Sequence, residues 1–426
     1  MRRFFLPLIA AVLMVRVASA QGTPPPSNSL PPTAIPGTPG SSSLSVRQAV
    51  ELALAHNPEL ATASAEVDAT GGARLQAQAR PNPEVAFLLE DTRRETRTTT
   101  LQINQPIELG GKRDARIAAA DRATDVARSD LGARRHAVRA AVVTAFFDLL
   151  AIQERARVSE ASLALTQRSS RAAAQRVQAG KVSPVEETKA RVAEASARIE
   201  LAQLRGEEVG ARARLNSAMG QPQGNHTLDG TLTDLPAPLS ESTLRAQLNS
   251  APALRRAELE VERRKAMTAV ENARRMSDVT ISLGAKRDQE VGRNQVVIGL
   301  SIPLPLFDRN QGNVLEALKR EDKARDELLA ARLQIESEAI QARERLAVSR
   351  AEAQSLAADV LPGAQSAFDA ATKGFELGKF SFLEALDAQR TLLQARTQYL
   401  RALAEAHRAS ADLNRMLGVD SLSNAQ

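Results

Sequence analysis

Two short stretches of the chain alternate apolar and polar residues with a period of two. They lie within residues 83–107, where a short apolar run over 85–89 comes before the alternation, and within residues 278–303, and each region contains a charged turn. This pattern predicts two β-hairpins, each with one apolar and one mostly polar face. The apolar positions are Leu101, Ile103 and Ile107 in the first hairpin and Val279, Ile281, Leu283, Val296, Ile298, Leu300 and Ile302 in the second.

Long helices are predicted after both hairpins. Residues 112–179 contain no proline, and residues 309–376 contain one, Pro362. At ~1.5 Å per residue each helix would be on the order of 100 Å long, which does not suit a compact domain. We expect helices over 184–219 and 381–417 to return alongside them, and Pro362 predicts a kink in the second long helix.

The second half of the chain repeats the first. The segment Gly180-Lys181-Val182-Ser183 recurs as Gly378-Lys379-Phe380-Ser381, 198 residues later (from 180 to 378). A period of about 200 residues is too long for a solenoid and indicates duplication of a whole strand-and-helix unit. The predicted organisation is a first repeat over 44–220, a linker over 221–239, a second repeat over 240–418 and a tail over 419–426.

The N-terminal residues have the pattern of a targeting segment. Residues 1–20 combine Arg2 and Arg3, a short apolar run and a small-residue end, which predicts a secretory signal peptide. Residues 21–43 are rich in Pro and Ser and predict a flexible leader. No later stretch approaches 18 apolar residues, so we expect no transmembrane helix after export.

The amino-acid composition indicates how the predicted helices pack. Hydrophobic residues make up 43% of the chain but aromatic residues only 3%, with no Trp and one Tyr. This mixture predicts long helices packed through small side chains rather than a thick globular core. The chain has no Cys, which excludes disulfides, thiolate metal sites and a lipidated N-terminal Cys.

The charged residues do not indicate a nucleic-acid partner. Positive and negative charges, 56 and 50 in number, alternate along the helices instead of forming a basic stripe. No nucleophile–base pair or phosphate loop is recognisable, which argues against an enzyme. We expect no cofactor and no metal site, because the histidines share no ligand spacing. These are His56, His136, His226 and His407.

Four strands in one chain are too few to close a barrel. Three chains would supply twelve strands, a size known for outer-membrane barrels, with apolar side chains toward lipid and polar ones toward a lumen. Their helices would form a twelve-helix tube. The pattern therefore permits, without requiring, a membrane barrel that continues into a helical conduit.

Four short motifs keep a fixed order along the two repeats. They are Ala55-His56-Asn57-Pro58-Glu59-Leu60, Gln105-Pro106-Ile107, Val360-Leu361-Pro362 and the paired Gly-Lys-x-Ser turns. On these motifs the chain resembles the TolC family of outer-membrane efflux factors over residues 44–418. The segment 105–113 looks most like the heavy-metal branch, the outer component of cobalt-zinc-cadmium pumps.

The resemblance implies a mainly helical fold with a small β part, assembled as a homotrimer. Such a trimer forms a periplasmic α-barrel of long antiparallel helices, capped by a 12-stranded outer-membrane β-barrel with four strands per protomer. The implied location is the outer membrane, in contact with lipid and with a periplasmic extension. The implied role is a passive exit duct that works with a periplasmic adaptor and an inner-membrane transporter of the RND type.

The cargo implied by the heavy-metal branch is a divalent cation such as cobalt, zinc or cadmium. Organic compounds or a secreted polypeptide are alternative cargoes for the same duct. A periplasmic coiled-coil scaffold without a pore is an alternative of a different class. It would be a soluble particle, whereas the duct would be a heat-resistant trimer in the outer membrane.

Glu384 and Asp387 follow the second tip turn, where family members carry an acidic ring at the periplasmic entrance. Threefold symmetry would place six carboxylates around one axis and attract cations. The alternative is two solvated helix carboxylates. The first repeat has Glu186 and Lys189 at the matching positions, so a ring would come mainly from the second repeat.

The Gly-Lys-x-Ser turns are expected to reverse the helices, with Gly supplying the backbone conformation. Apolar residues exposed at such tips suggest docking, and the family places the adaptor there. Contacts between protomers are the alternative. The tip residues are Gly180, Lys181, Val182, Gly378, Lys379 and Phe380.

Pro106, Pro303 and Pro305 lie where strands are expected to give way to helices, because proline removes a ladder donor. Lys112 and Arg113 fall at a predicted helix start, where the helix dipole disfavours cations. We expect them to contact lipid headgroups or to be solvated.

Overall fold

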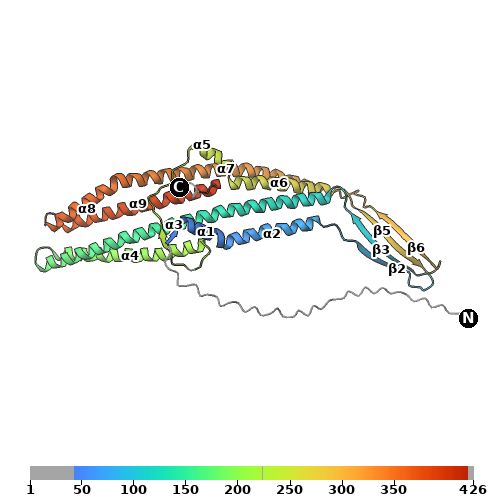
Figure 1. Cartoon of the computed structure of the whole chain (residues 1–426), viewed down its shortest axis with the longest axis horizontal. Helices are drawn as coiled ribbons and strands as arrows, with labels where there is room; N and C mark the ends of the chain where they lie inside the picture. The colour runs from blue at the N-terminus through green and yellow to red at the C-terminus, as the bar shows by residue number, and fades with distance from the viewer. Residues whose placement is uncertain (1–42, 223, 421–426) are drawn as a thin grey trace. The chain divides into compact units, whose positions relative to one another are not determined.

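The computed structural model describes residues 43–222 and 224–420 (Figure 1). The predicted signal peptide, the leader up to residue 42 and residues 421–426 of the tail lie outside this part. The elements in chain order are β1 (Ser43–Ser45), α1 (Val46–His56), α2 (Pro58–Gln78), β2 (Glu84–Glu90), β3 (Thr98–Ile107), α3 (Lys112–Gln178), α4 (Pro184–Ala218), β4 (Thr227–Asp229), α5 (Glu241–Leu248), α6 (Pro252–Ala273), β5 (Val279–Asp288), β6 (Arg293–Ser301), α7 (Gln311–Ser355), the π-helical turn η1 (Leu356–Val360), α8 (Leu361–Glu376) and α9 (Phe382–Leu417).

The four longer strands form one antiparallel sheet in the order β2-β3-β5-β6. Both period-two stretches therefore contribute a hairpin, and the β3–β5 pairing joins the two repeats. Leu101 of β3 lies opposite Phe87 on one side and Ala285 on the other. The alternating apolar side chains leave one face of the sheet largely apolar and exposed. Strands β2 and β6 are the two edges of the sheet.

Helix α3 is continuous over 67 residues. It contacts α2 and α6 along the part nearer the sheet and α4 along the part farther from it (Figure 1). Its side chains Phe146 and Leu149 are fully buried in a core that also takes residues from α1, α4 and α9. Contrary to the expectation from the sequence, α3 contains one 18-residue window that is apolar enough to cross a membrane, judged by length and composition alone. Half of that window is buried, so we assign it to the helical core.

The second long helix is interrupted. Between α7 and α8 the backbone makes the π-helical turn η1, in which the Leu361 N–H donates to the Leu356 oxygen, five residues back. Pro362 follows immediately, at the position where the sequence predicts a kink. Because proline has no N–H to donate, a wider turn next to it is a known way to accommodate the lost bond. The corresponding part of the first repeat is uninterrupted α3.

The predicted linker over 221–239 is tied to the helices. It contains β4, which pairs in parallel with β1, so that Leu44 lies beside Leu228. Arg350 of α7 donates to the Leu235 and Pro236 carbonyls at 2.9 Å, and Leu232 is buried. The sequence did not predict this small sheet, because three residues are too few to show a period.

Candidate functional site

The first tip reverses the chain by a Schellman turn after α3. Gly180 has a φ of 67°, its N–H donates to the Val177 oxygen at 2.9 Å, and the Lys181 N–H donates to the Arg176 oxygen at 2.9 Å. Helix α4 then begins with Ser183 as N-cap and Pro184 in its first turn. In this arrangement of helix end, turn and helix start, Gly180 and Lys181 lie on the surface and Val182 is half-buried.

The second tip repeats this turn. Gly378 has a φ of 71°, and the Lys379 N–H donates to the Gly374 oxygen at 2.8 Å. A Cβ added at Gly374 would collide with the ring of Phe380 and would have to displace it. The Phe380 ring therefore lies over Gly374 while remaining 45% exposed.

Glu384 is part of a capping box at the start of α9. Its carboxylate accepts from the Ser381 N–H at 2.7 Å and from the Ser381 hydroxyl at 2.9 Å, and the Glu384 N–H donates to that hydroxyl oxygen at 3.3 Å. These hydrogen bonds, first of all from the Ser381 backbone, lower the pKa of the exposed Glu384 carboxyl. Asp387 is exposed one turn farther along α9 and is not part of the cap. Thus the two carboxylates of the predicted ring are held differently.

The two tips of one chain contact each other. Arg176 of α3 donates from Nη2 to the Phe375 oxygen at 3.2 Å, and its guanidinium lies 4.3 Å from the centre of the Phe375 ring. Behind this contact, Ala173, Ala190 and Leu386 are buried together, which joins α3 and α4 to α9. Local sequence patterns do not predict this pair. The only signal was that Arg176 corresponds to Gly374 in the repeat.

The other functional region is the junction between sheet and helices. Lys112 Nζ lies 2.7 Å from Asp278 Oδ1, which also accepts from the Leu109 N–H at 3.1 Å, and Arg113 Nε donates to the Gln78 oxygen at 2.7 Å. These contacts connect the start of α3 and the segment after β3 to the end of α2 and to the residue just before β5. The expectation that Lys112 and Arg113 are solvated or contact headgroups therefore missed their protein partners.

The three prolines of this junction occupy two kinds of position. Pro106 is the penultimate residue of β3 and lies opposite Thr280, whereas Pro303 and Pro305 follow the last residue of β6. A short connection therefore joins β3 to α3 in the first repeat. A longer segment, which contains Pro303 and Pro305, joins β6 to α7 in the second.

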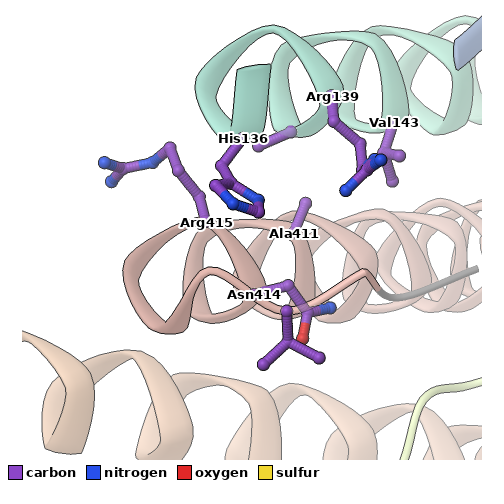
Figure 2. A pocket seen from close by; sticks show the side chains of 8 residues that line it. His136, Arg139, Val143, Ala411, Asn414 and Arg415 are labelled. Atoms are coloured by element: carbon purple, nitrogen blue, oxygen red, sulfur yellow. The ribbon is translucent and has the colours of Figure 1, made fainter. Parts of the chain in front are cut away.

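One pocket lies between two helices and is too small to hold a substrate. Figure 2 shows a small pocket between α3 and α9, with His136 and Arg139 on one helix and Ala411 and Asn414 on the other. Its volume is about 10 Å³, room for about one water molecule. Arg139 of α3 forms an ion pair with Asp420, and this contact holds the end of the described chain against α3. Among residues 43–222 and 224–420, no group of three His, Cys, Asp or Glu side chains could hold a metal ion.

Known proteins share the sequence pattern and the arrangement of helices and strands of this chain. The sequence model of the family described as outer membrane efflux protein matches residues 49–221 and 243–419, one match per repeat. The chain belongs to this family. It is 44% identical over 419 residues to the cobalt-zinc-cadmium resistance protein CzcC of Cupriavidus metallidurans, covering 98% of this chain and all of that protein. It is 28% identical to the nickel-cobalt-cadmium resistance protein NccC of Alcaligenes xylosoxydans xylosoxydans, over 67% of this chain and 66% of that protein.

Solved outer-membrane channels share the fold. The outer-membrane channel OprN superposes with a TM-score of 0.75 at 22% identity, over 88% of this chain and 90% of that one. CusC gives a TM-score of 0.74 at 19% identity, over 88% of this chain and 92% of that one. The predicted family, the mainly helical fold and the outer-membrane location with a periplasmic extension are confirmed. As a member of a channel family, the chain is not an enzyme.

Proposed function

We propose that this protein is the outer-membrane channel of a three-part exporter and serves as a passive exit duct for divalent heavy-metal cations. The observation that supports this choice of cargo is the 44% identity to CzcC over the whole of that protein, which is named for cobalt, zinc and cadmium resistance. NccC, at 28% identity, is named for nickel, cobalt and cadmium. The energy for export comes from an inner-membrane RND transporter, reached through a periplasmic adaptor.

The working form is a homotrimer. The edge strands β2 and β6 pair with each other between neighbouring chains and close a barrel of twelve strands, four from each protomer. Helix α4 supports the assembly through a row of apolar side chains exposed at intervals of seven residues. The row consists of Val185, Val192 and Ile199.

The tips form the periplasmic entrance. Asp387 and Glu384 from three chains ring this entrance and attract cations, with Asp387 the freer of the two because Glu384 caps α9. The exposed Phe380 and its neighbours Gly378 and Lys379, with Gly180, Lys181 and Val182 of the first tip, dock the adaptor.

The resistance profile of a deletion strain tests the cargo. Zinc, cobalt, cadmium and nickel salts are titrated beside antibiotics, dyes and bile salts, and the gene is then restored. Selective sensitivity to the metals, reversed by the gene, is the expected result. Sensitivity to the organic compounds alone would retain the duct and reject the metal cargo.

A further inference from the structure

An exposed apolar row continues beyond the end of the sheet. Along β6, Val296, Ile298 and Leu300 are 68–78% exposed on one face. The strand ends at Ser301, but the same alternation continues through Ile302 and Leu304, which are 50% and 75% exposed. The row is therefore longer than the strand that begins it.

The prolines explain why the alternation continues. Pro303 and Pro305 occupy the intervening positions, and each fixes its own φ and favours extended backbone at the residue before it. Ile302 and Leu304 are those preceding residues. The segment beyond Ser301 therefore stays extended without a neighbouring strand, and Ile302 and Leu304 remain exposed on it. The segment turns at its end, where the Leu306 N–H donates to the Leu304 oxygen at 2.9 Å.

The added length corresponds to the thickness of a bilayer. From Val296 to Leu300 the row covers four steps of ~3.3 Å, which at a tilt of ~40° gives a height of only ~10 Å. From Val296 to Leu304 the same arithmetic gives ~20 Å, close to the ~25 Å apolar band of outer-membrane barrels. The strand portion alone is too short to span the apolar band.

Other exposed apolar side chains lie at the same junction. Phe307 is 91% exposed, and Leu306, Leu109 and Met276 are exposed as well. Leu109 follows β3 as Leu306 follows β6, and Met276 lies against Gly110, where an added Cβ would be 2.9 Å from the Met276 Cβ. We call these residues the apolar belt: Leu109, Met276, Ile302, Leu304, Leu306 and Phe307.

Charged residues adjoin the apolar belt on the side of the helices. Arg275 directly precedes Met276, Arg309 follows Phe307 by two residues, and both arginines are exposed. The carboxylate of Asp308, between Phe307 and Arg309, accepts from the Asn310 N–H at 2.9 Å. An apolar band followed by arginines matches the order of acyl chains and phosphates at the edge of a phospholipid leaflet.

We propose that the apolar belt inserts into the periplasm-facing phospholipid leaflet and anchors the channel there. It takes the place of the Trp and Tyr girdle common in such barrels, since the chain has no Trp and only one Tyr, Tyr399, in α9. In the proposed trimer, strand pairing occurs at the edge of β6 and leaves the apolar face of that strand, which leads into the belt, free for lipid. The inference rests on the outer-membrane location and is independent of the cargo.

Tryptophan fluorescence tests this directly, because the natural chain contains no Trp. Three single variants are reconstituted in vesicles of phosphatidylcholine brominated on the acyl chains. Phe307→Trp reports on the apolar belt, Phe87→Trp on the exposed sheet face and Val209→Trp on the exposed surface of α4. The expected result is that Phe307→Trp and Phe87→Trp each lose a large part of their emission, relative to unbrominated vesicles, while Val209→Trp loses none.

Quenching of Phe87→Trp without quenching of Phe307→Trp would overturn the proposal and place the segment in water or against protein. Absence of quenching at both positions would reject lipid contact by the sheet as well. Bromines at two depths on the acyl chain add a second readout. Phe307→Trp is expected to be quenched more strongly by bromines nearer the headgroup than by those near the chain end.

Discussion

At the scale of single residues, the capping box at the second tip limits what Glu384 can do. Its carboxylate is held by the N–H and hydroxyl of Ser381, whereas the exposed carboxylate of Asp387 stands outside the cap. In the proposed ring, Asp387 is therefore the carboxylate that no cap holds. The S-x-x-E spacing of Ser381 and Glu384 is itself the sequence signature of a capping box.

We predict that Glu384→Ala loosens the first turn of α9 and that Glu384→Gln does so much less, because glutamine can also complete a capping box. Hydrogen exchange of residues 381–388 in the trimer measures the difference. The pKa of Glu384 is lowered in the folded chain, so its stabilising effect is full above its ordinary value and declines as pH falls through the lowered one. Equal protection in both variants and the wild type would contradict the prediction.

His407 links the linker to the helical core. Its ring stacks on Phe147 with centroids 3.7 Å apart, and Nε2 lies 3.0 Å from the Leu232 oxygen, to which the neutral ring donates. Burial lowers the pKa of His407 below its ordinary value of 6.5, although the Leu232 bond and Asp234 act in the other direction. The folded protein therefore favours the neutral ring.

This environment predicts a pH-dependent stability. As pH falls through about 6.5, the unfolded chain takes up the His407 proton first, so the stability of the fold declines. His407→Leu is expected to reduce this slope while costing about 1–3 kcal/mol, because the Leu232 oxygen loses its donor. Thermal unfolding between pH 5 and 8 measures both effects, with the exposed His56 as a matched control in His56→Leu. An unchanged slope in His407→Leu would show that other groups dominate.

At the scale of elements, the sequence predicts what periodicity and local rules determine. The hairpins, the long helices and both tip turns follow from alternation, the scarcity of proline and the glycines at 180 and 378. The β1–β4 pairing could not be predicted because three residues carry no period. The contact between Arg176 and Phe375 depends on how the helix pair α3–α4 packs against the helix pair α8–α9. Local sequence patterns do not determine that packing.

The π-helical turn η1 makes the two long helices unequal, and we predict a matching difference in backbone protection. Hydrogen bonds in a π turn are poorer than in an α-helix, and Pro362 supplies no donor. Amides of residues 356–363 should exchange several-fold faster than those of the corresponding residues 158–165 of α3. Mass-spectrometric hydrogen exchange on the trimer compares the two peptides, and equal rates would count against a weak point in the second helix.

At the scale of the whole molecule, the two repeats each contain a β-hairpin and a helical tip, but they differ in their long helices and at their tips. The first repeat has an uninterrupted α3 and the basic residue Arg176 near its tip. The second has η1, Gly374 and the exposed Phe380. A trimer built from these chains would alternate three continuous and three interrupted helical hairpins around its entrance. The surface offered to an adaptor would then alternate as well, with Phe380 only in every second tip.

Adaptor docking can be tested at these alternate tips. Phe380→Asp is expected to abolish co-purification with the adaptor while leaving the trimer intact, and Phe380→Leu should retain binding because it preserves an apolar side chain. Gly374→Ala provides a further comparison, since an added Cβ displaces the Phe380 ring without altering its chemistry. If the ring must lie over Gly374 to be recognised, Gly374→Ala weakens co-purification as well. Full binding by Phe380→Asp in an intact trimer would move the docking surface away from the second tip.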